Sequence, residues 1–396
     1  RYNLLRLHGW TGDGIMSTAA NKMVQAAAGN SGDILDTLLM GTYFGGKDII
    51  VLDVSDISNI SDIGSADNIG GHAFFRPPSA IDLTNNLLFL PHSSGSPYNT
   101  DTYDISNLSS ISRTDVFYSG RQAEHGAIAD PNREILYSTG KASYYQIDKL
   151  DYSTPSALSR LTYASSDSNL NLYYPELSSD GDTLFTIGST GNYSGLLKSW
   201  DVSGTAFSSL DYLSHSGNPG GNYSGLNWIE QDNYLISANS LGYIKSFDVS
   251  DTSNLALEDT LNVTSSVSGA TFTTQHTRAV DSVNNLYFLT DYYGKVYIID
   301  VSDPTNLVYK NSITTQVSSG SSTGFVTVDP ARKLAFCSFQ SGGHATKAYL
   351  YVIDYSDINN LSLTTVDLET INSDFAPPSG IYNVGGGTFG YLFKGQ

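Results

Sequence analysis

Residues 49–56 read Ile-Ile-Val-Leu-Asp-Val-Ser-Asp, and residues 296–304 read Val-Tyr-Ile-Ile-Asp-Val-Ser-Asp-Pro. The same pattern, an apolar run that ends in Asp and leads into a polar turn, recurs about every 50 residues. A fixed period of this length indicates a repeat architecture. We expect each marker carboxylate to accept hydrogen bonds from the amides of the turn that follows it. The marker aspartates are Asp53, Asp104, Asp148, Asp201, Asp248, Asp300 and Asp354.

A second motif lies between these aspartates. Apolar runs flank a short polar turn in residues 80–89, 127–137, 177–185, 228–236, 279–288 and 326–336. Such turns predict β-hairpins. A hairpin, the Asp-marked strand and one outer strand give four strands per repeat, and no helical periodicity accompanies them. The sequence therefore predicts an all-β fold, a β-propeller of four-stranded antiparallel blades.

The chain ends decide how many blades we expect. The marked aspartates account for seven repeats, and further apolar runs lie at residues 2–8, 22–28, 379–384 and 388–393. We therefore predict a single β-propeller domain over residues 1–396 with eight blades. Residues 1–33 and 371–396 are expected to complete the last blade together, which would remove an open sheet edge. The alternative is a ring of seven blades with an N-terminal arm.

The repeats resemble those of the LVIVD-repeat family of bacterial and archaeal propeller proteins. The resemblance rests on residues 49–56, 296–304 and 351–357 and covers the chain from about residue 35 to 370. It implies a propeller located outside the cytoplasm, on the cell surface. It supplies no catalytic residue, because the motif is specific for architecture.

Composition narrows the possible partners. The 396 residues include 39 acidic and 20 basic ones, for a net charge of −19. Nucleic-acid binding requires a basic face, and a membrane span requires about 20 consecutive apolar residues. We therefore expect neither nucleic acid as a partner nor membrane insertion. A single Cys excludes a disulfide scaffold and cysteine-based zinc sites. The Asp180-Gly-Asp182 run resembles only part of a calcium loop, so we expect no metal and no cofactor.

Candidate binding residues lie in the variable loops. In a propeller, the loops before each innermost strand and between the second and third strands share one end, here called the top face. His125 and His276 both precede their turn aspartate by five residues, which places them at the mouth of the central channel. A His-lined site there could serve acid–base chemistry or bind a metal; alternatively, these side chains cap loop amides. The candidate ligand-binding residues are His72, His125, His276, Arg278, Tyr292 and Tyr293.

Two functions follow. The acidic, cysteine-poor composition and the lack of a contiguous catalytic motif favour a non-enzymatic extracellular or cell-surface propeller. It would act as a surface, appendage or virion subunit, with structural or adhesive contacts to protein or glycan, including self-assembly into a homo-oligomer. The alternative is a propeller enzyme (hydrolase, lyase or oxidoreductase) with a His-lined site on the top face. Propellers serve both functions.

Overall fold

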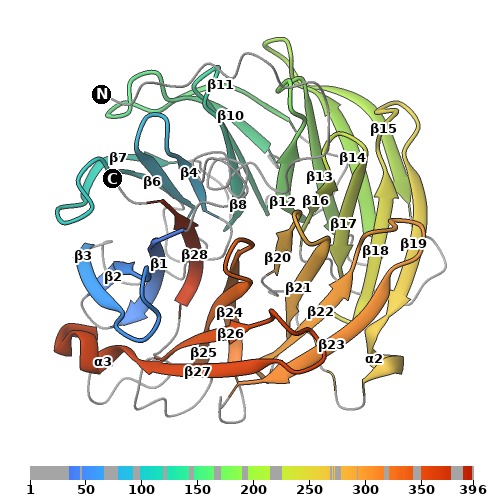
Figure 1. Cartoon of the computed structure of the whole chain (residues 1–396). Coiled ribbons are helices and arrows are strands. Elements are labelled where there is room, and N and C mark those ends of the chain that lie inside the picture. Colours follow the sequence, from blue (N-terminus) through green and yellow to red (C-terminus); the bar gives the residue numbers. More distant parts are fainter. Residues whose placement is uncertain are drawn as a thin grey trace, which may run out of the picture.

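A computed structural model gives the fold as a ring of seven four-stranded antiparallel sheets around a central axis (Figure 1). The predicted all-β propeller is confirmed. The residues that the structure describes are 35–44, 47–66, 79–91, 99–118, 123–141, 147–164, 171–189, 195–214, 225–267, 270, 272, 278–291, 293–315, 321–341, 349–375 and 387–394.

Each blade is a meander in which the first strand lies innermost and the last lies at the rim. Blade 1 contains β28 (Gly387–Phe393), β1 (Thr37–Phe44), β2 (Lys47–Asp53) and β3 (Ser61–Ala66). Blade 2 contains β4 (Ala80–Asp82), β5 (Leu87–Pro91), β6 (Asn99–Asp104) and β7 (Ser112–Tyr118). Blade 3 contains β8 (Ala123–Asp130), β9 (Ile135–Lys141), β10 (Ile147–Asp151) and β11 (Ser159–Ala164).

The remaining blades follow in chain order. Blade 4 contains β12 (Asn171–Leu177), β13 (Thr183–Ser189), β14 (Gly195–Asp201) and β15 (Ser208–Ser214). Blade 5 contains β16 (Asn227–Glu230), β17 (Tyr234–Ala238), β18 (Tyr243–Asp248) and β19 (Ala256–Asn262). Blade 6 contains β20 (Arg278–Asp281), β21 (Leu286–Thr290), β22 (Lys295–Asp300) and β23 (Val308–Thr314). Blade 7 contains β24 (Ser321–Asp329), β25 (Leu334–Ser341), β26 (Tyr349–Asp354) and β27 (Ser362–Asp367).

Helix is confined to three single turns in the described part of the chain. These are α2 (Val263–Ser266), α3 (Leu368–Ile371) and the 3₁₀ turn η1 (Ser373–Phe375). Each α turn directly follows an outer strand, and the side chain of the last strand residue caps it: Asn262 for α2 and Asp367 for α3. Such caps satisfy amides that have no partner within the helix.

The prediction of eight blades is wrong, and the seven-blade alternative matches the structure. Residues 388–393 belong to the innermost strand β28, which pairs with β1 in a register that joins Phe393 to Thr37 and Leu392 to Leu38. The C-terminal segment thus supplies the missing first strand of blade 1 rather than a hairpin of an eighth blade. The runs at residues 2–8, 22–28 and 379–384, together with residues 1–33 as a whole, lie outside the described residues.

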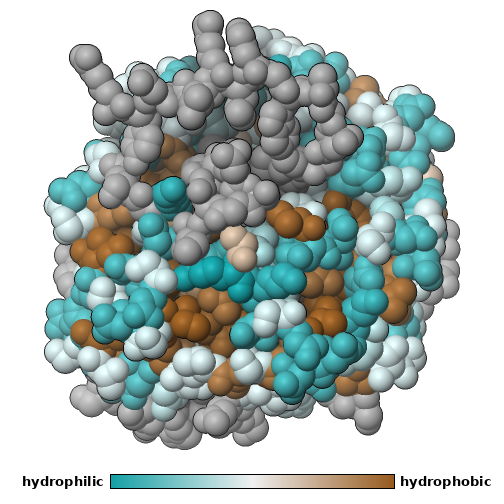
Figure 2. Space-filling model, in the orientation of Figure 1, coloured by the Kyte–Doolittle hydropathy of each residue, from teal (hydrophilic) through white to brown (hydrophobic). Residues whose placement is uncertain are grey.

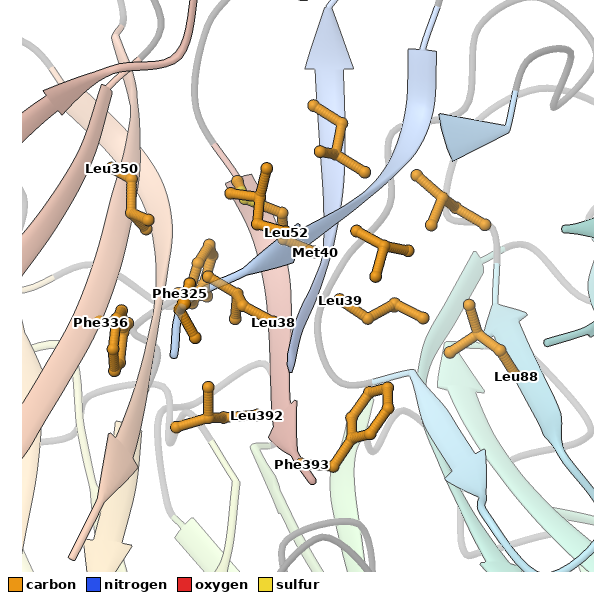
Figure 3. Close-up of a cluster of buried hydrophobic side chains, with 14 of the residues drawn as sticks. Leu38, Leu39, Met40, Leu52, Leu88, Phe325, Phe336, Leu350, Leu392 and Phe393 are labelled. Atoms are coloured by element: carbon orange, nitrogen blue, oxygen red, sulfur yellow. The ribbon is translucent and has the colours of Figure 1, made fainter. Parts of the chain in front are cut away.

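Apolar packing holds this closing strand in the ring. Leu392 and Phe393 are buried in one cluster with Leu38 and Leu39 of β1 and with Phe336 of blade 7 (Figure 3). A buried side chain of this size stabilises the fold by about 1.5–3 kcal/mol. Strands from both ends of the described chain therefore share one hydrophobic core.

The marker aspartates act as predicted at six of the seven positions. Asp53, for example, accepts a hydrogen bond from the amide of Ser55 at 2.9 Å, and Asp300 does the same for Ser302 at 3.0 Å. The prediction for Asp148 is wrong, because Asp151 ends that strand and accepts from the amide of Ser153 at 2.8 Å. Asp148 is buried within the strand.

The short turns opposite the top face combine a buried cap with a strained residue. Asp329 accepts from the amides of Ala331 and Arg332, and the fourth turn residue, Lys333, has φ of 55°. Left-handed backbone costs most residues roughly 1–2 kcal/mol but is tolerated by Asn and Gly. The equivalent residue in blade 6, Asn285, has φ of 53°.

We expect Lys333→Gly to raise the free energy of unfolding by about 0.5–1 kcal/mol, because glycine adopts this φ without strain. Asn285→Gly is the matched control and should change the stability by less than about half as much, since Asn already tolerates this region. Denaturant unfolding measures both variants. A destabilised Lys333→Gly chain would show that strain at this turn is negligible.

The pairing of the outer strand is irregular in most blades. Irregular register lies between the third and outer strands in blades 1 to 6. Such bulges discourage edge-to-edge pairing with other chains. Over the face seen in Figure 2, hydrophobic residues form separate groups between hydrophilic ones. Most of the large exposed apolar side chains lie on outer strands: Tyr118, Leu161, Tyr163, Leu210, Tyr212, Leu257 and Val308.

Candidate functional site

The structure describes the side chains of two of the six predicted site residues, and both belong to blade 6. Arg278 begins the innermost strand β20, and Tyr293 lies in the turn between β21 and β22. His72, His276 and Tyr292 lie outside the described residues. His125 falls within strand β8, but its side chain is not among those described. The predicted His-lined site therefore stays a prediction.

Arg278 crosses from blade 6 to blade 5 at the top of the ring. It is half-buried, and its Nη2 atom donates to the carbonyl of Leu226, 3.4 Å away, just before β16. Val280, two residues along the strand, packs in the cluster shared by blades 5 and 6. Side chains two apart in a strand face the same way. Arg278 thus carries a positive charge into the junction between two innermost strands.

Tyr293 stands on a turn that a buried carboxylate organises. Asp291 Oδ1 accepts from the amides of Tyr293 at 2.9 Å and Lys295 at 2.8 Å, and its Oδ2 atom accepts from the Tyr297 hydroxyl at 2.7 Å. Burial raises the pKa of Asp291, although these hydrogen bonds oppose the shift. The Tyr293 ring is 45% exposed on the top face. Asp291 therefore fixes the turn that presents Tyr293.

The structure adds two residues that the sequence did not indicate. Asn227 begins β16 and is 2% exposed, and Tyr287 of β21 is fully buried. Asn227 Oδ1 and the Tyr287 hydroxyl have no hydrogen-bond partner among the described residues. Leaving a buried polar group unpaired costs about 1–3 kcal/mol, and each such group requires an explanation.

Both side chains face the junction that Arg278 enters. Tyr287 packs in the cluster formed between blades 5 and 6. Trp228 donates through Nε1 to the Leu177 carbonyl of blade 4 at 3.2 Å, so its neighbour Asn227 faces the opposite way, toward blade 6. Burial raises the pKa of Tyr287, and the nearby Arg278 charge opposes that shift. Arg278, Asn227 and Tyr287 are named the junction group below.

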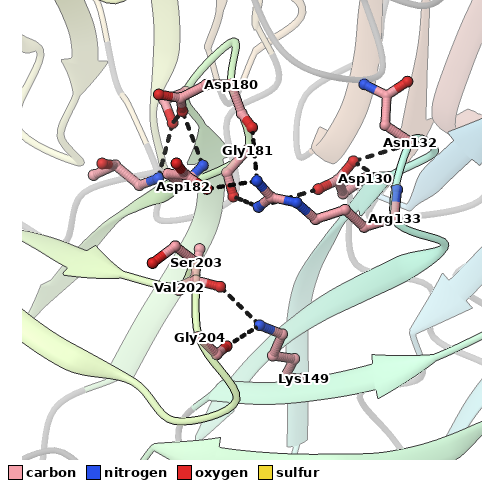
Figure 4. Close-up of polar contacts among 12 residues, drawn as sticks. Asp130, Asn132, Arg133, Lys149, Asp180, Gly181, Asp182, Val202, Ser203 and Gly204 are labelled. Carbon is pink, nitrogen blue, oxygen red and sulfur yellow. Dashed lines mark hydrogen bonds and ion pairs between the residues drawn. The ribbon is translucent and has the colours of Figure 1, made fainter.

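A larger polar cluster links blades 3 and 4 at the opposite end. Arg133 donates to the carbonyls of Asp180, at 3.0 Å, and Gly181 and pairs with the Asp182 carboxylate (Figure 4). Lys149 donates to the carbonyls of Val202 and Gly204, both at 2.7 Å. The turn at residues 180–182, which resembles part of a calcium loop, thus binds the guanidinium of a neighbouring blade.

The ionisable groups of this cluster have shifted pKa values with a structural cause. Burial raises the pKa of Asp130 and lowers that of Lys149. The hydrogen bond that Arg133 donates to Asp182 raises the pKa of Arg133. Perturbed groups mark functional sites, but structural networks perturb pKa values equally well. Because Arg133 and Lys149 bind turns of the next blade, we assign this cluster to the scaffold.

The described residues contain neither a cluster of metal ligands nor a membrane-spanning helix. Among them, no group of three or more His, Cys, Asp or Glu side chains could hold a metal ion. Within the same ranges, no helix is long and apolar enough to cross a membrane.

Solved structures share this architecture at low sequence identity. A protein from Lactobacillus plantarum superposes with a TM-score of 0.66 at 13% identity, covering 91% of this chain and 99% of its own. The periplasmic gluconolactonase of Pseudomonas aeruginosa gives 0.65 at 11% identity, covering 83% and 94%. A candidate 6-phosphogluconolactonase from Bacteroides fragilis gives 0.65 at 10% identity, covering 89% and 96%.

Sequence comparison identifies no family. No protein-family model and no curated protein sequence matches the chain. The resemblance to the LVIVD-repeat family therefore stays a prediction.

The structural neighbours correct the functional expectation. Proteins named as lactonases share the fold over most of both chains, which contradicts a non-enzymatic surface, appendage or virion subunit and favours the propeller enzyme kept as the alternative. The non-enzymatic expectation had rested in part on the lack of a contiguous catalytic motif. On a propeller, a site is assembled from side chains of several blades, so no such motif is required.

Proposed function

We propose that this protein is a propeller hydrolase that opens a sugar lactone on its top face, at the mouth between blades 5 and 6. The observation that carries the proposal is a half-buried arginine, Arg278, at the start of an innermost strand. The lactonases named among the structural neighbours supply the substrate class. A location outside the cytoplasm belongs to the same proposal, supported by the periplasmic neighbour.

Lactone hydrolysis requires the protein to stabilise one developing negative charge and to assist proton transfer. Water adds to the carbonyl carbon, the ring C–O bond breaks, and the released alkoxide takes up a proton to give a hydroxy acid. The guanidinium of Arg278 would stabilise the negative charge that develops on the carbonyl oxygen, and this effect is largest where water is excluded. His125 and His276 remain the predicted groups for proton transfer.

We expect the purified chain to release acid from D-glucono-1,5-lactone or its 6-phosphate faster than the spontaneous reaction, measured by pH-stat titration. Arg278→Met should lower kcat/KM by about 10²–10³-fold, the effect of removing one donor to an oxyanion. Arg278→Lys should retain part of the activity because it keeps the charge.

Lys310→Met is the matched control, since it removes one positive charge from an outer strand of the same blade. It should leave kcat/KM unchanged. Circular dichroism and melting temperature verify that each variant is folded. Acid release at the spontaneous rate by the wild-type chain, with both lactones, would refute the proposal.

A further inference from the structure

We propose that the junction group, Arg278, Asn227 and Tyr287, is a subsite that binds a hydroxyl group of a small polyhydroxylated ligand between blades 5 and 6. The inference rests on the proposed function for its ligand class, but the contacts of Asn227 and Tyr287 are independent of the chemistry. Its basis is the pair of buried polar atoms, one on each blade, that find no partner among the described residues.

The chemistry of the group defines the guest. Asn227 Oδ1 only accepts hydrogen bonds, and the Tyr287 phenol can donate or accept. Because burial raises the pKa of Tyr287, its hydroxyl stays protonated at neutral pH. A hydroxyl group both donates and accepts, so one hydroxyl can satisfy the amide oxygen and the phenol together. An apolar guest would leave both atoms unpaired.

The position of Arg278 indicates the side from which a ligand would enter the junction. Arg278 is the member of the junction group that solvent reaches, because it is half-buried while the other two are buried. A ligand from the top face therefore meets the guanidinium first and the neutral pair behind it. A sugar acid or lactone has this arrangement, with a carbonyl or carboxylate at one end and hydroxyls along the chain.

Two buried phenols at other blade junctions have carboxylate partners. Tyr152 donates to Asp82 at 2.8 Å, and Tyr355 donates to Asp281 at 2.7 Å, each across a junction between blades. Tyr287 is thus a buried phenol at a blade junction that lacks the carboxylate found by Tyr152 and Tyr355. Tyr137 also lacks a partner among the described residues, so what sets the junction between blades 5 and 6 apart is the arginine that leads to it from the top face.

The test compares two Tyr-to-Phe substitutions, at Tyr287 and at Tyr152, each of which removes a phenolic oxygen. D-Gluconate, the stable product of lactone opening, is titrated into the chain and its binding measured by calorimetry. Tyr287→Phe should weaken D-gluconate binding about tenfold, the equivalent of one hydrogen bond, and should leave the melting temperature unchanged or higher. Asn227→Leu should weaken binding similarly. Tyr152→Phe, the matched control, should lower the melting temperature and leave D-gluconate affinity unchanged.

The outcomes separate this inference from the proposed function. Lactone hydrolysis with the same KM and D-gluconate affinity in Tyr287→Phe would overturn the subsite and leave the hydrolase standing. Binding of D-gluconate that depends on Tyr287, without any lactone hydrolysis, would do the opposite. No D-gluconate binding by the wild-type chain, or a crystal structure soaked in D-gluconate with only a water between Asn227 and Tyr287, would also overturn the subsite.

Discussion

Arg332→Met is expected to lower the free energy of unfolding by about 3–5 kcal/mol, the cost of breaking a buried ion pair from one side. The Arg332 Nε atom donates to the fully buried Asp329 carboxylate at 2.6 Å. Its Nη atoms donate to the carbonyls of Leu35 and Val54 at 2.6 Å and of Ser55 at 3.1 Å. The substitution would leave the Asp329 carboxylate of blade 7 without its positive partner and three carbonyls of blade 1 without this donor.

Denaturant unfolding monitored by circular dichroism measures this change. Lys310→Met serves as the control, because Lys310 pairs with Asp300 at 2.9 Å while both side chains stay partly exposed. Such surface pairs contribute about 0–1 kcal/mol. Arg332→Lys should be intermediate, since one ammonium cannot replace the planar guanidinium at four acceptors. Equal midpoints for Arg332→Met and Lys310→Met would contradict the bridging role of Arg332.

Ending the chain at residue 386 is expected to abolish cooperative folding. The truncation removes β28, unpairs the whole inner edge of β1 and deletes Leu392 and Phe393 from the core. Replacing a single buried Leu or Phe by Ala typically costs 2–5 kcal/mol, and domains are stable by only about 5–15 kcal/mol. Loss of the near-ultraviolet circular dichroism signal and of a sharp thermal transition would report the effect.

A circular permutant controls for this truncation. Phe393 pairs with Thr37, so only Lys394, Leu35 and Asp36 would separate β28 from β1 if residue 394 were joined to residue 35. One inserted Gly gives the four-residue turn that joins Asp281 to Leu286 in blade 6. The permutant 387–394–Gly–35–375 should fold cooperatively. A chain ending at 386 that melts like the full chain would mean that closure contributes little.

The fold was predictable because each repeat carries an Asp whose side chain is required by the turn that follows it. An Asp two residues before a Ser closes the third strand of each blade, and sequence alone identifies it where the pair is intact. The prediction for blade 3 was wrong because it took Asp148 as the marker. Asp148 and Asp151 lie in the same strand, and only Asp151 is followed by Ser at the second position. The blade count failed because pairing across the chain ends leaves no local pattern.

The candidate site was predictable only in part. Arg278 was predicted because it ends a variable loop, residues 273–278, on the top face. Tyr287 was hidden inside an apolar run, and its one signal is a phenol at a position that is Leu88, Leu136 or Leu235 in other blades. Asn227 gave no signal, since Asn is common near loops. The expected contacts with protein or glycan remain a prediction.

Blade 1 combines strands from opposite ends of the described chain, so its sheet cannot be completed until β28 has been synthesised. The ribosome makes β1 to β3 first and β28 last among the described strands, with about 320 residues between Ala66 and Gly387. At synthesis rates of roughly 5–20 residues per second, the first sheet waits tens of seconds for its inner strand. During that time the open edge of β1 and the side chains of Leu38 and Leu39 are exposed. We therefore expect chaperones to bind this nascent sheet during synthesis.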